Sequence, residues 1–167
     1  MPKLIRLKDG VFGWEEDRFS IVADEDEIPA GDVIVSLKRF MAEGEQLLGD
    51  RKVGVKLAPT EAVEDLVYDL PRLAVVALEF PSHRDGRNLS AARLLRQRYG
   101  YQGELRAVGE VLREQAQHMV RCGIDAFVPH DDSRPETWDR AVHRYRHVYQ
   151  RAADERTPAF VERGTGQ

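Results

Sequence analysis

The feature that most constrains the fold is an almost uninterrupted apolar segment, "LAVVALEF", which runs from Leu73 to Phe80. A strand that exposes one face to water alternates apolar and polar residues. A run without that alternation is typical of a strand buried on both faces, as in a parallel sheet covered by helices. The segment therefore predicts an α/β fold with a mainly parallel sheet.

Short apolar runs alternate with helical patterns along most of the chain. The predicted strands cover residues 33–36, 53–58, 73–80, 104–109 and 125–129, and each precedes apolar residues at helical spacing. The last helix is expected over residues 136–152, with Tyr145 and Tyr149 on its apolar face. Five such units over residues 33–156 predict a single α/β domain, either open and doubly wound or a partial barrel. A complete eight-stranded barrel needs roughly 200 residues or more.

The two ends of the chain are less regular. Residues 1–32 predict irregular N-terminal strands or a hairpin, and residues 157–167 predict a flexible tail. No segment resembles a signal peptide or the ~20 apolar residues of a membrane span, so a cytoplasmic location is expected. The formal net charge of −4 argues against a general nucleic-acid binder or a binder of anionic membranes. Exposed sheet edges make a homodimer reasonable.

A candidate ligand site follows the most apolar strand. Ligands of parallel α/β sheets bind at the carboxyl ends of the strands, and the stretch "EFPSHRDGRNLS" begins at that end with Glu79. Arg84 and Arg87, together with backbone N–H groups at the start of the next helix, could hold a small oxyanion. Asn88 or Ser90 is positioned to cap that helix.

The middle of the same stretch permits two interpretations. In the first, Gly86 lets the backbone approach a ligand closely, and Asp85 orients Arg87 by paired hydrogen bonds. In the second, Asp85-Gly86 is an ordinary turn, and the charged pair is a surface ion pair that contributes little. The residues alone leave both interpretations open.

The fourth predicted strand carries charges on one face. Glu104 and Arg106 point to the same side of this strand, and a buried Arg106 needs a carboxylate partner. Glu79 on the neighbouring strand is the expected partner of Arg106. This ion pair could hold the two strand ends together, or it could line the same cleft as Arg87. Two further candidates follow this strand at the ligand-bearing edge, Gly109 and Glu110.

Several sharper patterns are missing from the sequence. It contains no dinucleotide or nucleotide glycine motif and no nucleophile-elbow motif, so neither a catalytic residue nor a cofactor can be assigned. His143 and His147 are four residues apart, but arginines share their face, which favours a solvated surface over a metal site. Cys122 excludes an intrachain disulfide because it is the single cysteine.

Three linked motifs carry a family resemblance: "DGR-x-x-S-x-A-R-L-L-R", "GELRAVG-x-VLR-x-Q" and "RCG-x-DAF". In this order and spacing they resemble the bacterial family known as domain of unknown function 934. The matching positions are Asp85, Gly86, Arg87, Ser90, Arg93, Arg96, Gly103, Glu104, Arg106, Gly109 and Gln115. The family more usually has Gly-Tyr-Ser at residues 88–90 and Asp at Glu110 and Glu114. His83 and Arg84 are not part of its pattern.

The resemblance implies a pathway rather than a reaction. Members of that family are often encoded beside assimilatory sulfite reductase, and some are labelled probable oxidoreductases. We therefore expect an accessory protein of assimilatory sulfite reduction, with a small-oxyanion pocket built from Arg87, Arg106 and their carboxylate partners. The alternatives are an oxidoreductase-type enzyme with an unrecognised cofactor, such as a flavin, and an interaction module that docks on sulfite reductase.

Overall fold

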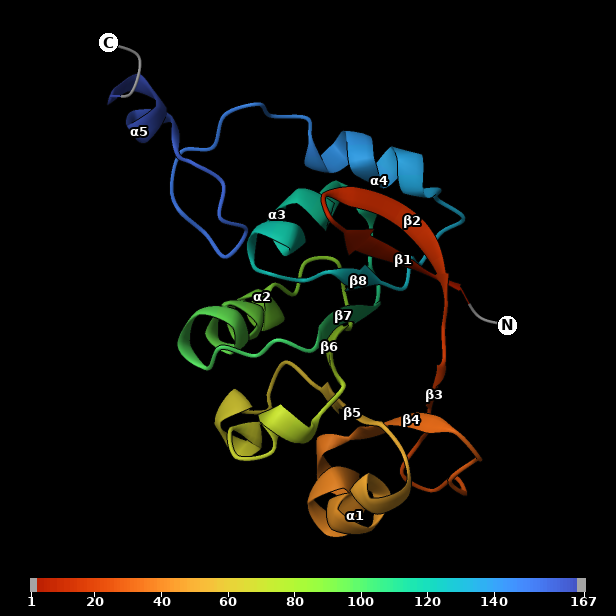
Figure 1. Cartoon of the computed structure of the whole chain (residues 1–167). Helices are drawn as coiled ribbons and strands as arrows, with labels where there is room; N and C mark the ends of the chain where they lie inside the picture. Colours follow the sequence, from red (N-terminus) through yellow and green to blue (C-terminus); the bar gives the residue numbers. More distant parts are fainter. Residues whose placement is uncertain (1–2, 165–167) are drawn as a thin grey trace.

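The protein forms one sheet with helices packed against it (Figure 1). The computed structural model describes residues 3–164, and residues 1–2 and 165–167 lie outside that description. The strands are β1 (Lys3–Lys8), β2 (Val11–Glu16), β3 (Phe19–Ile21), β4 (Asp32–Ser36), β5 (Val53–Leu57), β6 (Val75–Phe80), β7 (Glu104–Gly109) and β8 (Ala126–Phe127). The α-helices are α1 (Leu37–Asp50), α2 (Arg87–Arg93), α3 (Ala116–Arg121), α4 (Pro135–Val142) and α5 (Ala159–Gly164).

The sheet is mixed, with the strand order β2-β1-β8-β7-β6-β5-β4-β3. Strands β3 to β8 are parallel, whereas β1 runs antiparallel to β8 and β2 runs antiparallel to β1. The prediction of a mainly parallel sheet is corrected by this N-terminal hairpin, which joins the sheet beside its last strand. The alternation within residues 3–16 predicts strands but carries no information about the strand they pair with.

The predicted number of strand–helix units is also wrong. The connection between β5 and β6 contains only two short 3-10 turns, Val63–Leu66 and Leu70–Arg72, in place of the expected helix. Pro71 lies within the second turn, where its missing N–H group would interrupt a continuous helix. The region expected to be a flexible tail contains α5.

The sheet curls into a half-barrel with α1, α2 and α3 on its outer side (Figure 1). Strands β2 and β3 lie at opposite edges of the sheet, yet only Asp17 and Arg18 separate them in the chain. Three Cα–Cα steps reach at most about 11 Å, so the two edges must approach each other. The link between β2 and β3 crosses the open side of the half-barrel (Figure 1). The doubly wound alternative is therefore wrong, and the partial-barrel alternative describes the fold.

The central strands are buried on both faces. On the helix side, Val76 and Leu78 of β6 join the main core, and on the inner side Val75 and Ala77 join a smaller apolar cluster. Phe19, beside the crossing link, packs against that inner cluster. The burial predicted for the apolar run is confirmed, because these four β6 side chains are at most 1% exposed.

The last predicted helix stops early. Helix α4 ends at Val142, and the Tyr145 and Tyr149 side chains are exposed rather than part of the core. Arg140, Arg144 and His147 would share one face of a longer helix, where like charges one turn apart are unfavourable. The first half of the segment is anchored instead by the buried Trp138 ring, whose centroid lies 4.8 Å from that of Phe127. Within residues 3–164, no helix is long and apolar enough to cross a membrane.

Candidate functional site

The loop between β6 and α2 lies at the predicted carboxyl-terminal edge. Helix α2 has Gly86 as its N-cap, and no side chain caps it, so the predicted capping by Asn88 or Ser90 is wrong. The buried Asn88 amide instead donates to the carbonyl oxygens of Leu57 (3.0 Å) and Glu79 (2.8 Å). Asn88 therefore fastens the ends of β5 and β6 together, while Ser90 is exposed on α2 beside Arg93.

The predicted pair of Asp85 and Arg87 is present. Asp85 Oδ1 accepts hydrogen bonds from Arg87 Nε (2.9 Å) and from the Arg87 backbone N–H (3.2 Å), and Asp85 Oδ2 accepts one from Nη2 (2.6 Å). These bonds lower the pKa of the Asp85 carboxyl and raise the pKa of the Arg87 guanidinium. The Arg87 side chain is 60% exposed, and among the described residues its Nη1 makes no hydrogen bond. One arm of an oriented guanidinium thus faces solvent.

Glu110 and Gln115, which both follow β7 in the chain, hold the backbone of the same loop. Glu110 Oε2 accepts the His83 backbone N–H (2.7 Å), and Glu110 Oε1 lies 3.3 Å from His83 Nδ1. The Gln115 amide donates to the His83 carbonyl oxygen. The bonds from His83 lower the pKa of Glu110. Both polar backbone groups of His83 are therefore anchored to the neighbouring unit of the fold.

Gly109 brings the ends of β6 and β7 close together. Its φ is +98°, and a Cβ atom at this position would lie 2.4 Å from the Phe80 carbonyl oxygen. The Glu110 backbone N–H donates to that same oxygen at 2.7 Å. The glycine is required both by its conformation and by this approach, and it places Glu110 where it can reach the loop.

Arg106 lies elsewhere, inside the half-barrel. Its side chain is 1% exposed, its Nη1 lies 2.8 Å from Asp17 Oδ2, and its Nε lies 2.6 Å from Glu104 Oε1. The predicted pairing with Glu79 is wrong, because Glu79 lies opposite Val108 in the register and bonds Lys56 Nζ at 3.1 Å. Asp17 comes from the link that crosses the open side of the half-barrel, a contact without any local signal in the sequence.

The structure does not bring Arg106 to Arg87. The Arg106 guanidinium is occupied by two carboxylates and lies 5.7 Å from the centre of the Phe19 ring, whereas Arg87 is largely exposed. Arg6 also pairs with Glu104, so the interior contains a connected network of charges. These contacts match the fastener interpretation of the Arg106 ion pairs, with Asp17 and Glu104 as the partners.

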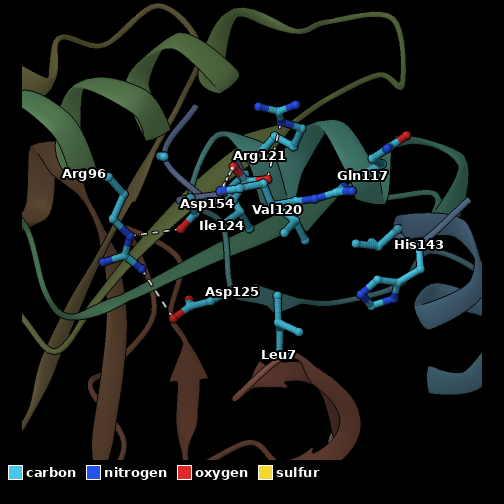
Figure 2. A pocket seen from close by; sticks show the side chains of 14 residues that line it. Leu7, Arg96, Gln117, Val120, Arg121, Ile124, Asp125, His143 and Asp154 are labelled. Atoms are coloured by element: carbon cyan, nitrogen blue, oxygen red, sulfur yellow. Dashed lines mark hydrogen bonds and ion pairs between the residues drawn. The ribbon is translucent and has the colours of Figure 1, made fainter. Parts of the chain in front are cut away.

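A cavity of about 360 Å³ lies at the opposite end of the parallel strands (Figure 2). It is bounded by the end of α3, the turn into β8, the end of β1, the end of α4 and residues 153–156. Its wall contains both apolar and charged side chains: Leu7, Val120, Ile124 and Val142 beside Arg96, Arg121, Asp125 and Asp154. No local sequence pattern predicts this cavity, because its wall comes from five separate parts of the chain: residues 7–10, Arg96, residues 117–125, residues 142–143 and residues 153–156.

Asp125 and Arg96 form one wall of this cavity. Asp125 Oδ1 accepts the Leu105 backbone N–H at 2.9 Å, and Oδ2 lies 3.4 Å from Arg96 Nη2. Burial raises the pKa of Asp125 and lowers the pKa of Arg96. Arg96 also donates to the carbonyl oxygens of Tyr101 (2.6 Å), Gly103 (2.8 Å) and Gly123 (3.0 Å). Its contacts within the protein therefore occupy all three guanidinium nitrogens.

The comparison with protein families agrees with the motifs. A family model described as a bacterial protein of unknown function (DUF934) matches residues 54–160, which is more than half of the chain. The chain belongs to the DUF934 family. The matched segment contains the whole carboxyl-terminal edge described above and most of the cavity wall, but not β1 to β4. No curated protein matches the chain.

The motif residues that identified the DUF934 family fall into three groups in space. Asp85, Arg87 and Gln115 meet at the loop between β6 and α2, whereas Arg96 lines the cavity at the other end. Glu104 and Arg106 form the third group, inside the half-barrel. Among the described residues, no three His, Cys, Asp or Glu side chains gather as a metal site would require.

Proposed function

We propose that the protein is an accessory protein of assimilatory sulfite reduction that binds a small oxyanion at the carboxyl-terminal edge of its sheet. The pathway part of the proposal rests on the family resemblance. The binding part rests on Arg87, with Asp85, Gly86, Gly109 and Glu110 as the residues that position it. Arg106 is left out of this site because two carboxylates already occupy its side chain.

One observation carries the binding proposal: the exposed arginine is held in a fixed orientation on a loop that is itself fastened. Asp85 uses both carboxylate oxygens to hold the Arg87 guanidinium, and Glu110 and Gln115 hold the His83 backbone. A donor that is already ordered loses less side-chain entropy on binding. Guanidinium N–H groups form short, charge-assisted hydrogen bonds with sulfite, sulfate and phosphate oxygens.

The proposal can be tested by thermal unfolding in sulfite, sulfate, phosphate and chloride at matched ionic strength. Saturation at ~100 times the Kd adds ~2.7 kcal/mol of stability. For a domain of this size that is a rise in Tm of about 5–10 °C. We expect a sulfite-selective rise that Arg87→Ala abolishes.

Arg113→Ala is the matched control, because Arg113 is also exposed and also pairs with an adjacent carboxylate, Glu114, at 3.1 Å. This variant should retain the full response to sulfite. A sulfite response that is equal in Arg87→Ala and in the wild-type protein would contradict the proposed site, as would the absence of any selective response.

A second candidate function is docking on sulfite reductase through a basic surface. Residues 140–151 contain four arginines, two histidines and no acidic residue. Among the described residues, Arg140 and Arg144 form no ion pair, and both line a groove of about 560 Å³ together with Tyr145. Arginine and tyrosine are enriched at protein interfaces. Purified sulfite reductase should then be retained by immobilised wild-type protein at low salt, and the Arg140→Glu/Arg144→Glu variant should lose this retention.

Three other expectations stay predictions. An oxidoreductase with a bound flavin would show flavin absorbance after purification. A homodimer would show twice the chain's mass of 19.0 kDa in light scattering. A cytoplasmic location would be seen as recovery of the protein in the soluble cell fraction rather than with membranes.

A further inference from the structure

The wall of the cavity in Figure 2 contains a buried carboxylate, Asp154, that forms an ion pair with Arg121 but receives no hydrogen bond at Oδ2 from the part of the chain that the structure describes. The Asp154 side chain is 7% exposed, and among the described residues its Oδ2 accepts no hydrogen bond. The nearest cation, Arg121 Nε, lies 3.4 Å away. A buried carboxylate oxygen without a donor is unfavourable. A hydrogen-bond donor in the cavity would remove that penalty, and an ammonium group would do so best because the bond is charge-assisted.

Donors suited to a carboxylate lie around the same cavity. Arg121 and Arg156 are each held through Nη2, Arg121 by the Gln150 carbonyl and Arg156 by those of Tyr145 and Arg146. Among the described residues, Nη1 of each of these two arginines makes no hydrogen bond and remains available to a ligand. Figure 2 shows Gln117 on the side of the cavity away from Arg96, and among the described residues its amide makes no hydrogen bond.

The rest of the wall is apolar and of suitable size. Leu7, Val120, Ile124 and Val142 provide aliphatic surface beside the charged groups. The volume of about 360 Å³ lies within the ~300–1,000 Å³ that is usual for small-molecule sites. The segment with Asp154 is tied to α3 by the Ala153 backbone N–H, which donates to the Arg121 carbonyl oxygen at 2.9 Å. This bond holds the Asp154 segment beside α3.

We propose that this cavity binds a small α-amino acid with an aliphatic side chain. The ammonium group would bind the Asp154 carboxylate, the ligand's carboxylate would bind Arg121, Arg156 and Gln117, and its side chain would pack against Val120 and Val142. The lining contains more cationic than anionic side chains, which disfavours a ligand that lacks a carboxylate. The site is separate from Arg87 and its loop, and it does not depend on the proposed oxyanion function.

Titration calorimetry with three related probes tests the proposal on the full chain. L-leucine contains both charged groups, 4-methylpentanoate lacks the amine, and 3-methylbutan-1-amine lacks the carboxylate. We expect saturable binding of L-leucine, at least tenfold weaker binding of 4-methylpentanoate, and no measurable binding of the amine. Equal affinity for L-leucine and 4-methylpentanoate would overturn the role of Asp154, and no binding of any probe would overturn the site.

Variants separate a binding role from a structural one. Asp154→Asn has the same shape and should weaken L-leucine binding at least tenfold, whereas Glu155→Gln, which changes the adjacent exposed carboxylate, should leave the Kd unchanged within twofold. If circular dichroism shows that Asp154→Asn is unfolded, Gln117→Leu is the second variant, and it should weaken L-leucine binding at least threefold. Sulfite should not compete with L-leucine; competition would place both ligands in this cavity and contradict the separation of the two sites.

Discussion

Replacing Arg106 with methionine would leave two carboxylates inside the half-barrel without their shared cation. Arg106 is 1% exposed, and the side chains of its partners Asp17 and Glu104 are 8% and 12% exposed. Glu104 would keep Arg6 as a partner, but Asp17 would lose its ion pair. Because Asp17 lies on the link between the two edge strands, the closure of the half-barrel should weaken as well.

The expected loss of stability is large for a single substitution. Removing one partner of a buried ion pair costs about 3–5 kcal/mol. A domain of this size has a total stability of about 5–15 kcal/mol. The loss corresponds to a fall in Tm of roughly 6–20 °C at ~2–4 °C per kcal/mol.

Urea unfolding followed by tryptophan fluorescence measures this loss, since Trp138 is fully buried. Arg113→Met is the control, because its exposed pair with Glu114 should contribute ~1 kcal/mol or less. Adding Asp17→Asn to Arg106→Met should restore part of the stability by removing the unpaired buried charge. A loss below ~1 kcal/mol for Arg106→Met would contradict the expected cost of breaking a buried ion pair, which is several times larger.

Three further predictions concern other parts of the fold. In urea unfolding, Gly109→Ala should destabilise the protein by ~1–3 kcal/mol more than Gly31→Ala. Both glycines have a φ of +98°, but only Gly109 lies against a backbone oxygen. Equal losses would contradict this close approach. Native Cys122 should react with iodoacetamide at least 100-fold more slowly than in urea, because it is buried and burial raises the pKa of its thiol. Burial raises the folded-state pKa of Asp125, so the folded protein holds this proton more tightly than the unfolded chain. We compare the free energy of unfolding of the wild-type protein with that of Asp125→Asn. The difference, wild type minus variant, should fall as the pH rises from about 4 through the raised pKa. A difference that rises would show that the charges of Arg6 and Arg96 affect the pKa of Asp125 more than burial does.

Local patterns predicted the central part of the fold. The apolar run before Pro81 predicted a strand buried on both faces, because that requirement is imposed at each position of β6. The end of α3 also has a local cause, since Gly123 follows the helix with a φ of +97°, a conformation that favours glycine. The pair of Asp85 and Arg87 was predictable because only Gly86 separates them and a tight turn brings them together.

Long-range pairings were not predictable in the same way. The sequence separates Asp17 from Arg106 by 89 residues, and nothing near either residue indicates the other. The position of β1 beside β8 likewise depends on packing across the whole sheet rather than on a local pattern. The cavity around Asp154 forms only when five separate parts of the chain are in place. Its one local signal in the sequence is Asp125, a charged residue directly before the buried strand β8.

The most direct test of the proposed function is a sulfite titration of the 15N-labelled protein, followed by 1H–15N correlation spectra. We expect saturable shifts centred on the backbone amides of residues 83–90 and on Glu110, with little change in residues 117–125 or 153–156. Shifts centred on the cavity residues, or changes spread evenly over the surface, would contradict an oxyanion site at the carboxyl-terminal edge.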